Sequence, residues 1–222
     1  MVLSFGPLYF SKTLYLFTLM DYTLLANIAM GIALSACAGF RVFVPMLAAS
    51  IAGHFGVIDL PADMNWLGTW PAMISLGTAA VAEIGAYYIP FIDNLLDTIA
   101  APLSVAAGTV LASSILPIAN QEPLIRWGIA LLAGGSAAGT IQLGTGLLRL
   151  FSSKATVGTG NFVVSTTENA AAVSGSLLSF LIPVVVALLV IVLVIWILVK
   201  GIKQVRKFGR RGDRSEHQFP IT

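Results

Sequence analysis

Long apolar runs separated by short polar connections dominate the chain. They cover residues 24–55, 70–89, 95–116, 124–151 and 177–199. About 20 apolar residues are enough for a helix to cross a membrane, so each run predicts a membrane-embedded helix. The pattern therefore predicts an all-α integral membrane protein.

The first run is too long for one straight crossing and is interrupted near its centre. Gly39 and Pro45 flank Arg41 within this run. Proline breaks helices and frees backbone carbonyls, and a charge in hydrocarbon is costly unless it has a partner. We therefore predict a broken first helix with Arg41 in the protein interior beside the break. Freed carbonyls and a carboxylate, from Glu83 or Glu168, are expected to hold the guanidinium.

A shorter and more polar stretch before the last run predicts a sixth helix. Ser165 and Glu168 have the spacing of a capping box, so this helix is expected to start at Ser165. Residues 165–176 are short and polar for a crossing, which leaves a crossing and a re-entrant helix both open. Earlier in the chain, Asp93 is expected to cap the helix that follows Pro90.

Composition strengthens the membrane prediction. The chain of 222 residues is 57% hydrophobic and only 10% charged, with a mean hydropathy of +0.91. Soluble domains contain about 25% charged residues. The single cysteine excludes a disulfide within the chain. His54 and His217 have no neighbours suited to metal binding, so neither a metal nor a cofactor is predicted.

Charge distribution predicts the topology. Seven of the twelve Lys and Arg residues lie between Lys200 and Arg214, directly after the last apolar run. Such a cluster fits a cytoplasmic anchor under the positive-inside rule, with anionic membrane lipids as partners and no nucleic acid. Six crossings with both ends inside a plasma (inner) membrane satisfy the rule. We therefore divide the chain into a membrane domain over residues 22–200 and a disordered cytoplasmic tail over residues 201–222.

Residues 1–21 are treated as a separate extension. They are apolar and aromatic with one lysine, and they lack the cleavage pattern of a signal peptide. The true translational start is expected near Met20, which would make this extension an artefact or an interfacial helix.

A faint internal repeat links the two halves of the chain. The sequence Gly-Ile-Ala-Leu occurs at residues 31–34 and again at residues 128–131, and each half continues to a glutamate, Glu83 or Glu168. Three crossings per half would make the repeats inverted, an arrangement typical of secondary transporters. Chance similarity between helices rich in glycine and alanine is the alternative.

Several motifs in order resemble a bacterial family of polytopic membrane proteins known as domain of unknown function 4126. The motifs are GFRVFVP, a span with a glutamate, IPFIDxxxD and GNxxxSxxE. The matching positions are Arg41, Glu83, Pro90, Asp93, Asp97, Arg149, Asn161, Ser165 and Glu168. The resemblance implies a polytopic helical fold and supplies no activity. This chain departs from the pattern at Tyr87-Tyr88, where members tend to carry Asp-Lys. It departs again in the helix before Arg149, where members tend to carry His and Lys and this chain has Gln142 and no lysine.

The ionisable and polar residues in or near the predicted spans form the candidate site. The main set is Arg41, Glu83, Glu168, Asn161 and Ser165, and the secondary acidic set is Asp93 and Asp97. Arg41 is read either as a structural ion pair or as an anion site with exposed N–H groups at the helix break. Glu83 is read either as the ion-pair partner of Arg41 or as a proton carrier. For the acidic set, a helix cap with an interfacial charge is favoured over a cation site.

Three functions follow from these readings. The first is a small transporter or flippase for an ion, a small metabolite or a lipid-linked anion. The second is a structural or accessory membrane subunit whose charges serve only packing. The third is an intramembrane lipid-modifying enzyme, in which Asp93, Asp97 and Asn161 would converge at a lateral opening. A non-enzymatic function is preferred, the small substrate is unknown, and a homo-oligomer is left open.

Overall fold

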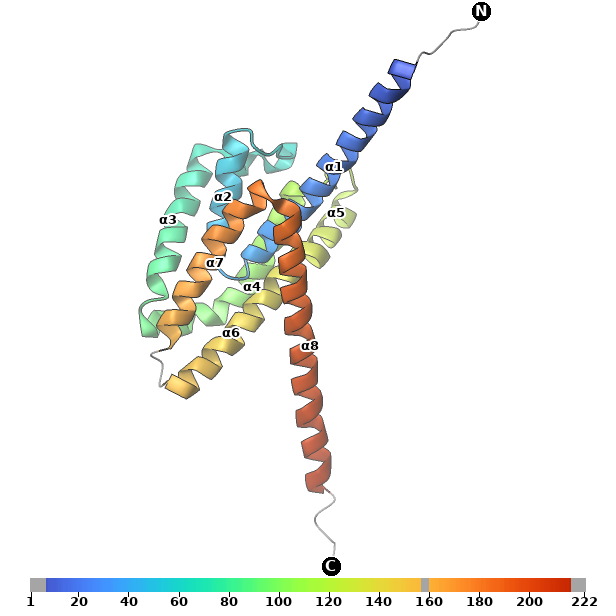
Figure 1. The fold of residues 1–222 in the computed structure, drawn as a ribbon. Helices are drawn as coiled ribbons and strands as arrows, with labels where there is room; N and C mark the ends of the chain where they lie inside the picture. The colour runs from blue at the N-terminus through green and yellow to red at the C-terminus, as the bar shows by residue number, and fades with distance from the viewer. Residues whose placement is uncertain (1–6, 157–159, 217–222) are drawn as a thin grey trace, which may run out of the picture.

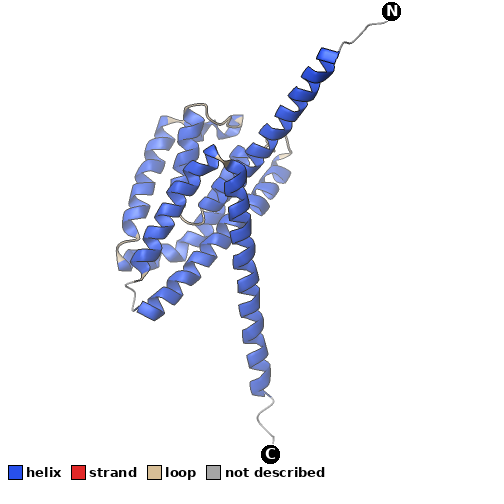
Figure 2. Ribbon diagram, in the orientation of Figure 1, coloured by secondary structure: helices blue, strands red, loops and turns tan. Residues whose placement is uncertain are grey.

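The computed structural model describes residues 7–156 and 160–216, and regular secondary structure in these ranges is helical throughout (Figure 2). The elements are α1 (Pro7–Cys37), α2 (Phe43–His54), η1 (Ala62–Gly68), α3 (Trp70–Ala86), α4 (Pro90–Ile115), α5 (Pro123–Ala130), η2 (Leu131–Gly135), α6 (Ser136–Thr156), α7 (Asn161–Leu181) and α8 (Pro183–Glu216). The predicted all-α fold is confirmed.

Three helical stretches are long and apolar enough to cross a membrane. They are Thr98–Ile115 in α4, Pro123–Ser152 through α5, η2 and α6, and Pro183–Lys203 in α8. The last has a mean hydropathy of 3.1 and exposes most of its surface, so a lipid environment must cover it. The chain is a membrane protein.

The predicted break in the first apolar run is confirmed, and it reverses the chain. α1 ends at Cys37 and α2 begins at Phe43, and Figure 1 shows α2 returning toward the end of the bundle from which α1 enters. Pro45 lies in the first turn of α2, where its missing N–H costs no hydrogen bond. Gly39 is needed because a Cβ there would collide with the carbonyl oxygen of Ala138 in α6.

This reversal changes the expected topology. Because residues 24–55 form two antiparallel helices, the chain makes one pass more than a single broken crossing would. The start of α1 and the end of α8 consequently lie at opposite ends of the bundle (Figure 1). This arrangement does not support the expectation that both ends share one side, and a count of six membrane helices is not confirmed.

The same extra pass affects the predicted repeat. The first Gly-Ile-Ala-Leu segment lies in α1 and the second begins in α5. Figure 1 shows α1 and α5 running in the same direction. An inverted repeat requires opposite directions, so the inverted relation of the two halves is not supported.

Two predicted helix starts are wrong. α4 begins at Pro90 with Ile89 as its N-cap, so Asp93 lies inside the first turn instead of capping it. α7 begins at Asn161, so Ser165 and Glu168 lie beyond its first turn and form no capping box. Four polar residues of this helix, Ser165, Glu168, Ser176 and Ser179, are buried in the bundle, so apolar content alone underestimates its length.

The last helix also has different bounds. α7 continues to Leu181 and α8 begins at Pro183, so residues 177–181 belong to α7. α8 then extends to Glu216, and the expected disordered tail is helical over residues 201–216. At the other end of the chain, residues 7–21 are continuous with α1.

Close backbone contacts hold the centre of the bundle together. α4 packs against the π-helical η2, where a Cβ on Gly134 would collide with the carbonyl oxygen of Gly108. A Cβ on Gly108 would in turn lie 2.6 Å from the carbonyl oxygen of Gly134. Small residues permit this approach, which is the common way in which helices associate in membranes.

An ion pair that the sequence did not indicate connects η1 to this central part. Nη1 of Arg126 in α5 donates to both carboxylate oxygens of Asp63, at 2.9 and 2.8 Å. Nη2 of Arg126 donates to the carbonyl oxygen of Ser113 in α4 at 3.0 Å. One guanidinium therefore joins three elements at one end of the bundle.

We expect this ion pair to make stability depend on pH in the acid range. Hydrogen bonding from Arg126 lowers the pKa of Asp63 below its ordinary value. A lowered folded-state pKa stabilises the fold above the unfolded pKa of about 4, and this contribution is lost as the pH falls through the folded pKa. Melting temperatures in detergent across this range should fall less steeply for Asp63→Asn than for the wild type.

Asp59→Asn in the same connection is the control for that measurement, because Asp59 is an exposed acid close in sequence. It should leave the pH profile unchanged. An unaltered profile in Asp63→Asn would contradict the assignment.

Candidate functional site

Arg41 lies in the turn between α1 and α2, inside the bundle. Its side chain is only 1% exposed. Nη1 donates to Oε2 of Glu168 at 2.9 Å and to the carbonyl oxygen of Phe40 at 3.2 Å. Nη2 donates to the carbonyl oxygen of Ser165 at 3.2 Å, and Nε donates to Oδ1 of Asn169. The predictions that Arg41 is buried beside the break and that a glutamate holds it are confirmed. Of the two carbonyls, that of Phe40 lies at the break, whereas that of Ser165 comes from α7.

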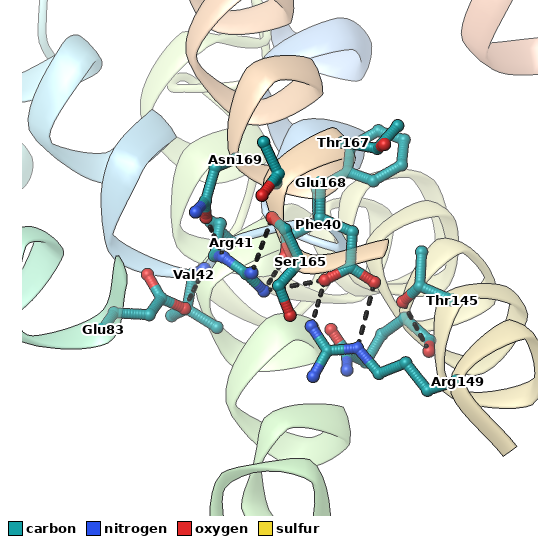
Figure 3. Close-up of polar contacts among 12 residues, drawn as sticks. Phe40, Arg41, Val42, Glu83, Thr145, Arg149, Ser165, Thr167, Glu168 and Asn169 are labelled. Carbon is teal, nitrogen blue, oxygen red and sulfur yellow. Dashed lines mark hydrogen bonds and ion pairs between the residues drawn. The ribbon is translucent and has the colours of Figure 1, made fainter. Parts of the chain in front are cut away.

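Glu168 in α7 also binds a second arginine. Arg149 of α6 donates from Nε to Oε1 of Glu168 at 3.2 Å and from Nη2 to Oε2. Arg149 is 3% exposed and Glu168 is 4% exposed. Figure 3 shows the carboxylate between the two guanidinium groups. We call Arg41, Arg149 and Glu168 the arginine–glutamate cluster.

The ring of Tyr87 covers this cluster. Cζ of Arg41 lies 3.8 Å from the ring centroid, and Cζ of Arg149 lies 4.2 Å from the same centroid. Guanidinium groups are attracted to the negative face of an aromatic ring. Tyr87 follows the last residue of α3, so it adds α3 to the helices that meet at the cluster.

Glu83 binds backbone N–H groups, and its reading as a proton carrier stays a prediction. Its Oε1 accepts from the backbone N–H of Val42 at 2.8 Å, and its Oε2 accepts from the N–H of Phe43 at 3.0 Å. It therefore caps the start of α2, where the helix dipole favours a negative charge. The expected ion pair between Glu83 and Arg41 is wrong. The N–H groups that were expected to coordinate an external anion are bound by this internal carboxylate.

The other predicted residues divide into three cases. Ser165 contributes its carbonyl to Arg41, while its buried hydroxyl makes no hydrogen bond within the part of the chain that the structure describes. Asn161 is the first residue of α7, and the amide that binds Arg41 belongs to Asn169, about two turns farther along. Asp93 and Asp97 belong to α4, but their side chains lie outside the described residues.

Sequence reasoning missed Asn169 and underrated Arg149 and Tyr87. One signal was present for Arg149. Gln142, Thr145 and Arg149 are spaced by three and four residues in an otherwise apolar helix, and all three are buried. Such spacing puts them on one face of α6. No comparable signal marks Asn169, whose partner is 128 residues away in the chain.

An apolar crevice between α3 and α4 leads to the edge of the cluster. Its volume is about 270 Å³. Alanines line the α3 side and larger aliphatic residues line the α4 side, namely Ala79, Ala82, Ala86, Leu96, Ile99 and Leu103. Glu83 and Tyr87 are also lining residues, and the ring of Tyr87 contacts both guanidiniums.

The fold and this cluster define an all-helical membrane protein with a buried charge site where four helices meet. The family model of a domain of unknown function, DUF4126, matches residues 28–203. The chain belongs to this family. No curated protein and no solved structure matches the chain.

Proposed function

We propose that the protein is a small membrane transporter or flippase, and that its substrate is an anionic amphiphile such as a lipid-linked anion. The observation that carries this proposal is the double contact of Tyr87, which lines the α3–α4 crevice and lies over both guanidiniums. An apolar chain in the crevice would bring its anionic head next to this ring.

The chemistry of the cluster suits an anionic head. Guanidinium groups bind carboxylate and phosphate oxygens through two parallel N–H bonds. In the resting state Glu168 supplies such oxygens to both Arg41 and Arg149. A substrate oxyanion would compete with Glu168 for the same donors once Tyr87 moves aside.

The crevice suits the apolar part of such a substrate. Among the described lining residues, the α3 side presents three alanines and the α4 side presents Leu96, Ile99, Ala100 and Leu103. Glu83 is the one carboxylate among the described lining residues, and both of its oxygens accept backbone N–H groups, from Val42 and Phe43. A chain entering from the side would therefore meet apolar surface before it reached Tyr87.

A flux measurement with purified protein in liposomes tests this proposal. The probe is fluorescent phosphatidylglycerol, whose transfer between leaflets is followed by chemical quenching from outside. Ala82→Phe fills the crevice and should slow transfer severalfold. Val81→Phe is the matched control on the exposed side of α3 and should leave the rate unchanged. A wild-type rate equal to that of protein-free liposomes would refute transfer of this lipid class, and parallel release of radiolabelled inorganic phosphate would point to a small anion instead.

A second candidate function is a structural or accessory subunit. It is favoured by the enclosure of Arg41, which is 1% exposed and donates to Asn169, Phe40, Glu168 and Ser165. In that case Ala82→Phe and Val81→Phe would behave alike in every flux assay. The lipid-modifying enzyme stays a prediction, because it depends on Asp93 and Asp97, whose side chains lie outside the described residues.

We place the protein in the plasma (inner) membrane as a multi-pass protein with its C-terminus in the cytoplasm. The support is the basic segment from Lys200 to Arg214, which follows the apolar part of α8. Since α1 starts at the opposite end of the bundle, its beginning would lie on the outer side.

Cysteine labelling measures this orientation. A maleimide that cannot cross membranes should label Ser215→Cys only after the cells are permeabilised. The wild type is the control, because its single cysteine, Cys37, is buried and should remain unlabelled. Labelling of Ser215→Cys in intact cells would contradict a cytoplasmic C-terminus.

A further inference from the structure

A second and larger cavity lies between α6 and α8, away from the α3–α4 crevice. Its volume is about 510 Å³. Leu148 and Phe151 of α6 form part of one wall, and Leu193 and Trp196 of α8 form part of the other. Lys200 and Lys203 also line it. We call this cavity the α6–α8 groove.

We propose that the α6–α8 groove is a binding site for one anionic phospholipid, with an acyl chain between α6 and α8 and the phosphate at Lys200 and Lys203. This site is separate from the proposed transport pathway and does not depend on it. The occupant is a lipid of the surrounding bilayer, which distinguishes it from a transported substrate.

The position of the lysines along α8 supports this assignment. The uncharged apolar run of α8 ends at Val199 and the basic segment begins at Lys200, so this part of the helix lies at the level of the lipid headgroups. Nζ of Lys200 lies 4.2 Å from the centroid of the Trp196 ring. Tryptophan and lysine at the end of a membrane helix mark the interface between hydrocarbon and water. The groove therefore has an apolar part at acyl-chain depth and two positive charges at phosphate depth.

The charges favour a lipid over a second copy of the chain. Two copies in one membrane have the same orientation, so pairing through this groove would bring Lys200 and Lys203 of both copies to the same level. Like charges would then face each other at the rim. An anionic headgroup meets the same lysines with the opposite charge, and an acyl chain fits the apolar walls.

The groove also borders the site described above. Phe40 lines the groove, and its carbonyl oxygen accepts from Nη1 of Arg41 at 3.2 Å. On α6, Leu148 lines the groove while the next residue, Arg149, binds Glu168. A lipid in the groove would pack against the residues that position both arginines, so its binding should stabilise the fold.

The test measures thermal unfolding of the full chain in detergent with added lipid. Phosphatidylglycerol should raise the melting temperature more than phosphatidylcholine with the same acyl chains. Lys200→Gln/Lys203→Gln should abolish the difference between the two lipids. Arg210→Gln/Arg211→Gln removes the same charge farther along the basic segment and should keep the difference. Inorganic phosphate alone should produce no shift, because the acyl chain provides the apolar contact.

A second pair of variants tests the apolar part. Leu148→Trp fills the groove and should remove the shift from either lipid, while Leu189→Trp, at an exposed position of α8 outside the groove lining, should retain it. If Leu148→Trp does not fold, the lysine variants decide the question alone.

Equal shifts from both lipids in the wild type, or an unchanged difference in the double lysine variant, would overturn the proposal. Native mass spectra that show two chains and no retained lipid, with Leu148→Trp restoring single chains, would assign the groove to a second copy.

Discussion

Glu168→Gln is expected to destabilise the protein by roughly 3–5 kcal/mol, the usual cost of removing one partner from a buried ion pair. Glutamine has nearly the same volume, so the change removes the charge and preserves the packing. Arg41 and Arg149 would then be two buried cations that lie against the same tyrosine ring without the carboxylate that both now contact. The measurement is the melting temperature in detergent, followed by the loss of helical signal.

Glu122→Gln provides the control for this substitution. Glu122 is exposed and precedes α5, so the same chemical change should leave the melting temperature near that of the wild type. A Glu168→Gln protein that melts like Glu122→Gln would mean that the carboxylate contributes no net stability at the cluster.

The location of Arg41 could be predicted from the sequence because the free-energy cost of a charge in an apolar segment can be recognised from the neighbouring residues alone. A charge inside an apolar run must be buried against a partner, and glycine and proline nearby indicate where the helix ends. The small number of acids in the apolar part of the chain limited its partner to Glu83 or Glu168, and the sequence did not decide between them. These two predictions needed no knowledge of how the helices pack.

The reversal between α1 and α2 could not be predicted in the same way. An apolar run of this length is compatible with one broken crossing and with two antiparallel helices, because hydropathy alone does not record direction. The decision is made by tertiary contacts, such as the approach of Gly39 to the backbone of Ala138. The sequence reasoning did not anticipate that α2 reverses the chain. This single difference affected both the predicted side of the start of the chain and the predicted relation between the two halves.

The role of Glu83 was mistaken for a related reason. Sequence reasoning paired acids with the arginine, since opposite charges attract over distance. It did not weigh the N–H groups at the start of α2, which Glu83 caps with both oxygens. Once Glu83 is bound there, Glu168 is the described carboxylate that reaches Arg41, and it also reaches Arg149.

Arg41→Lys is expected to lose nearly as much stability as Arg41→Ala, although lysine retains the positive charge. The guanidinium donates from Nε, Nη1 and Nη2 to acceptors on both the α1–α2 turn and α7, and its Cζ lies 3.8 Å from the centroid of the Tyr87 ring. An ammonium group has three N–H bonds at one point and no planar face, so it cannot reach acceptors spread around a fork. Each lost bond to a charged group costs roughly 1.5–3 kcal/mol, and two lost bonds already approach the cost of removing the side chain.

Melting temperatures of the wild type, Arg41→Lys and Arg41→Ala in the same detergent measure this order. Arg214→Lys, in the basic C-terminal segment, is the control for the chemical change and should melt with the wild type. Recovery of most of the stability by Arg41→Lys would show that charge alone holds this turn. The planar contacts to Asn169, Ser165 and Tyr87 would then be incidental to the fold, and the geometry of the fork would give no reason for an arginine at this position.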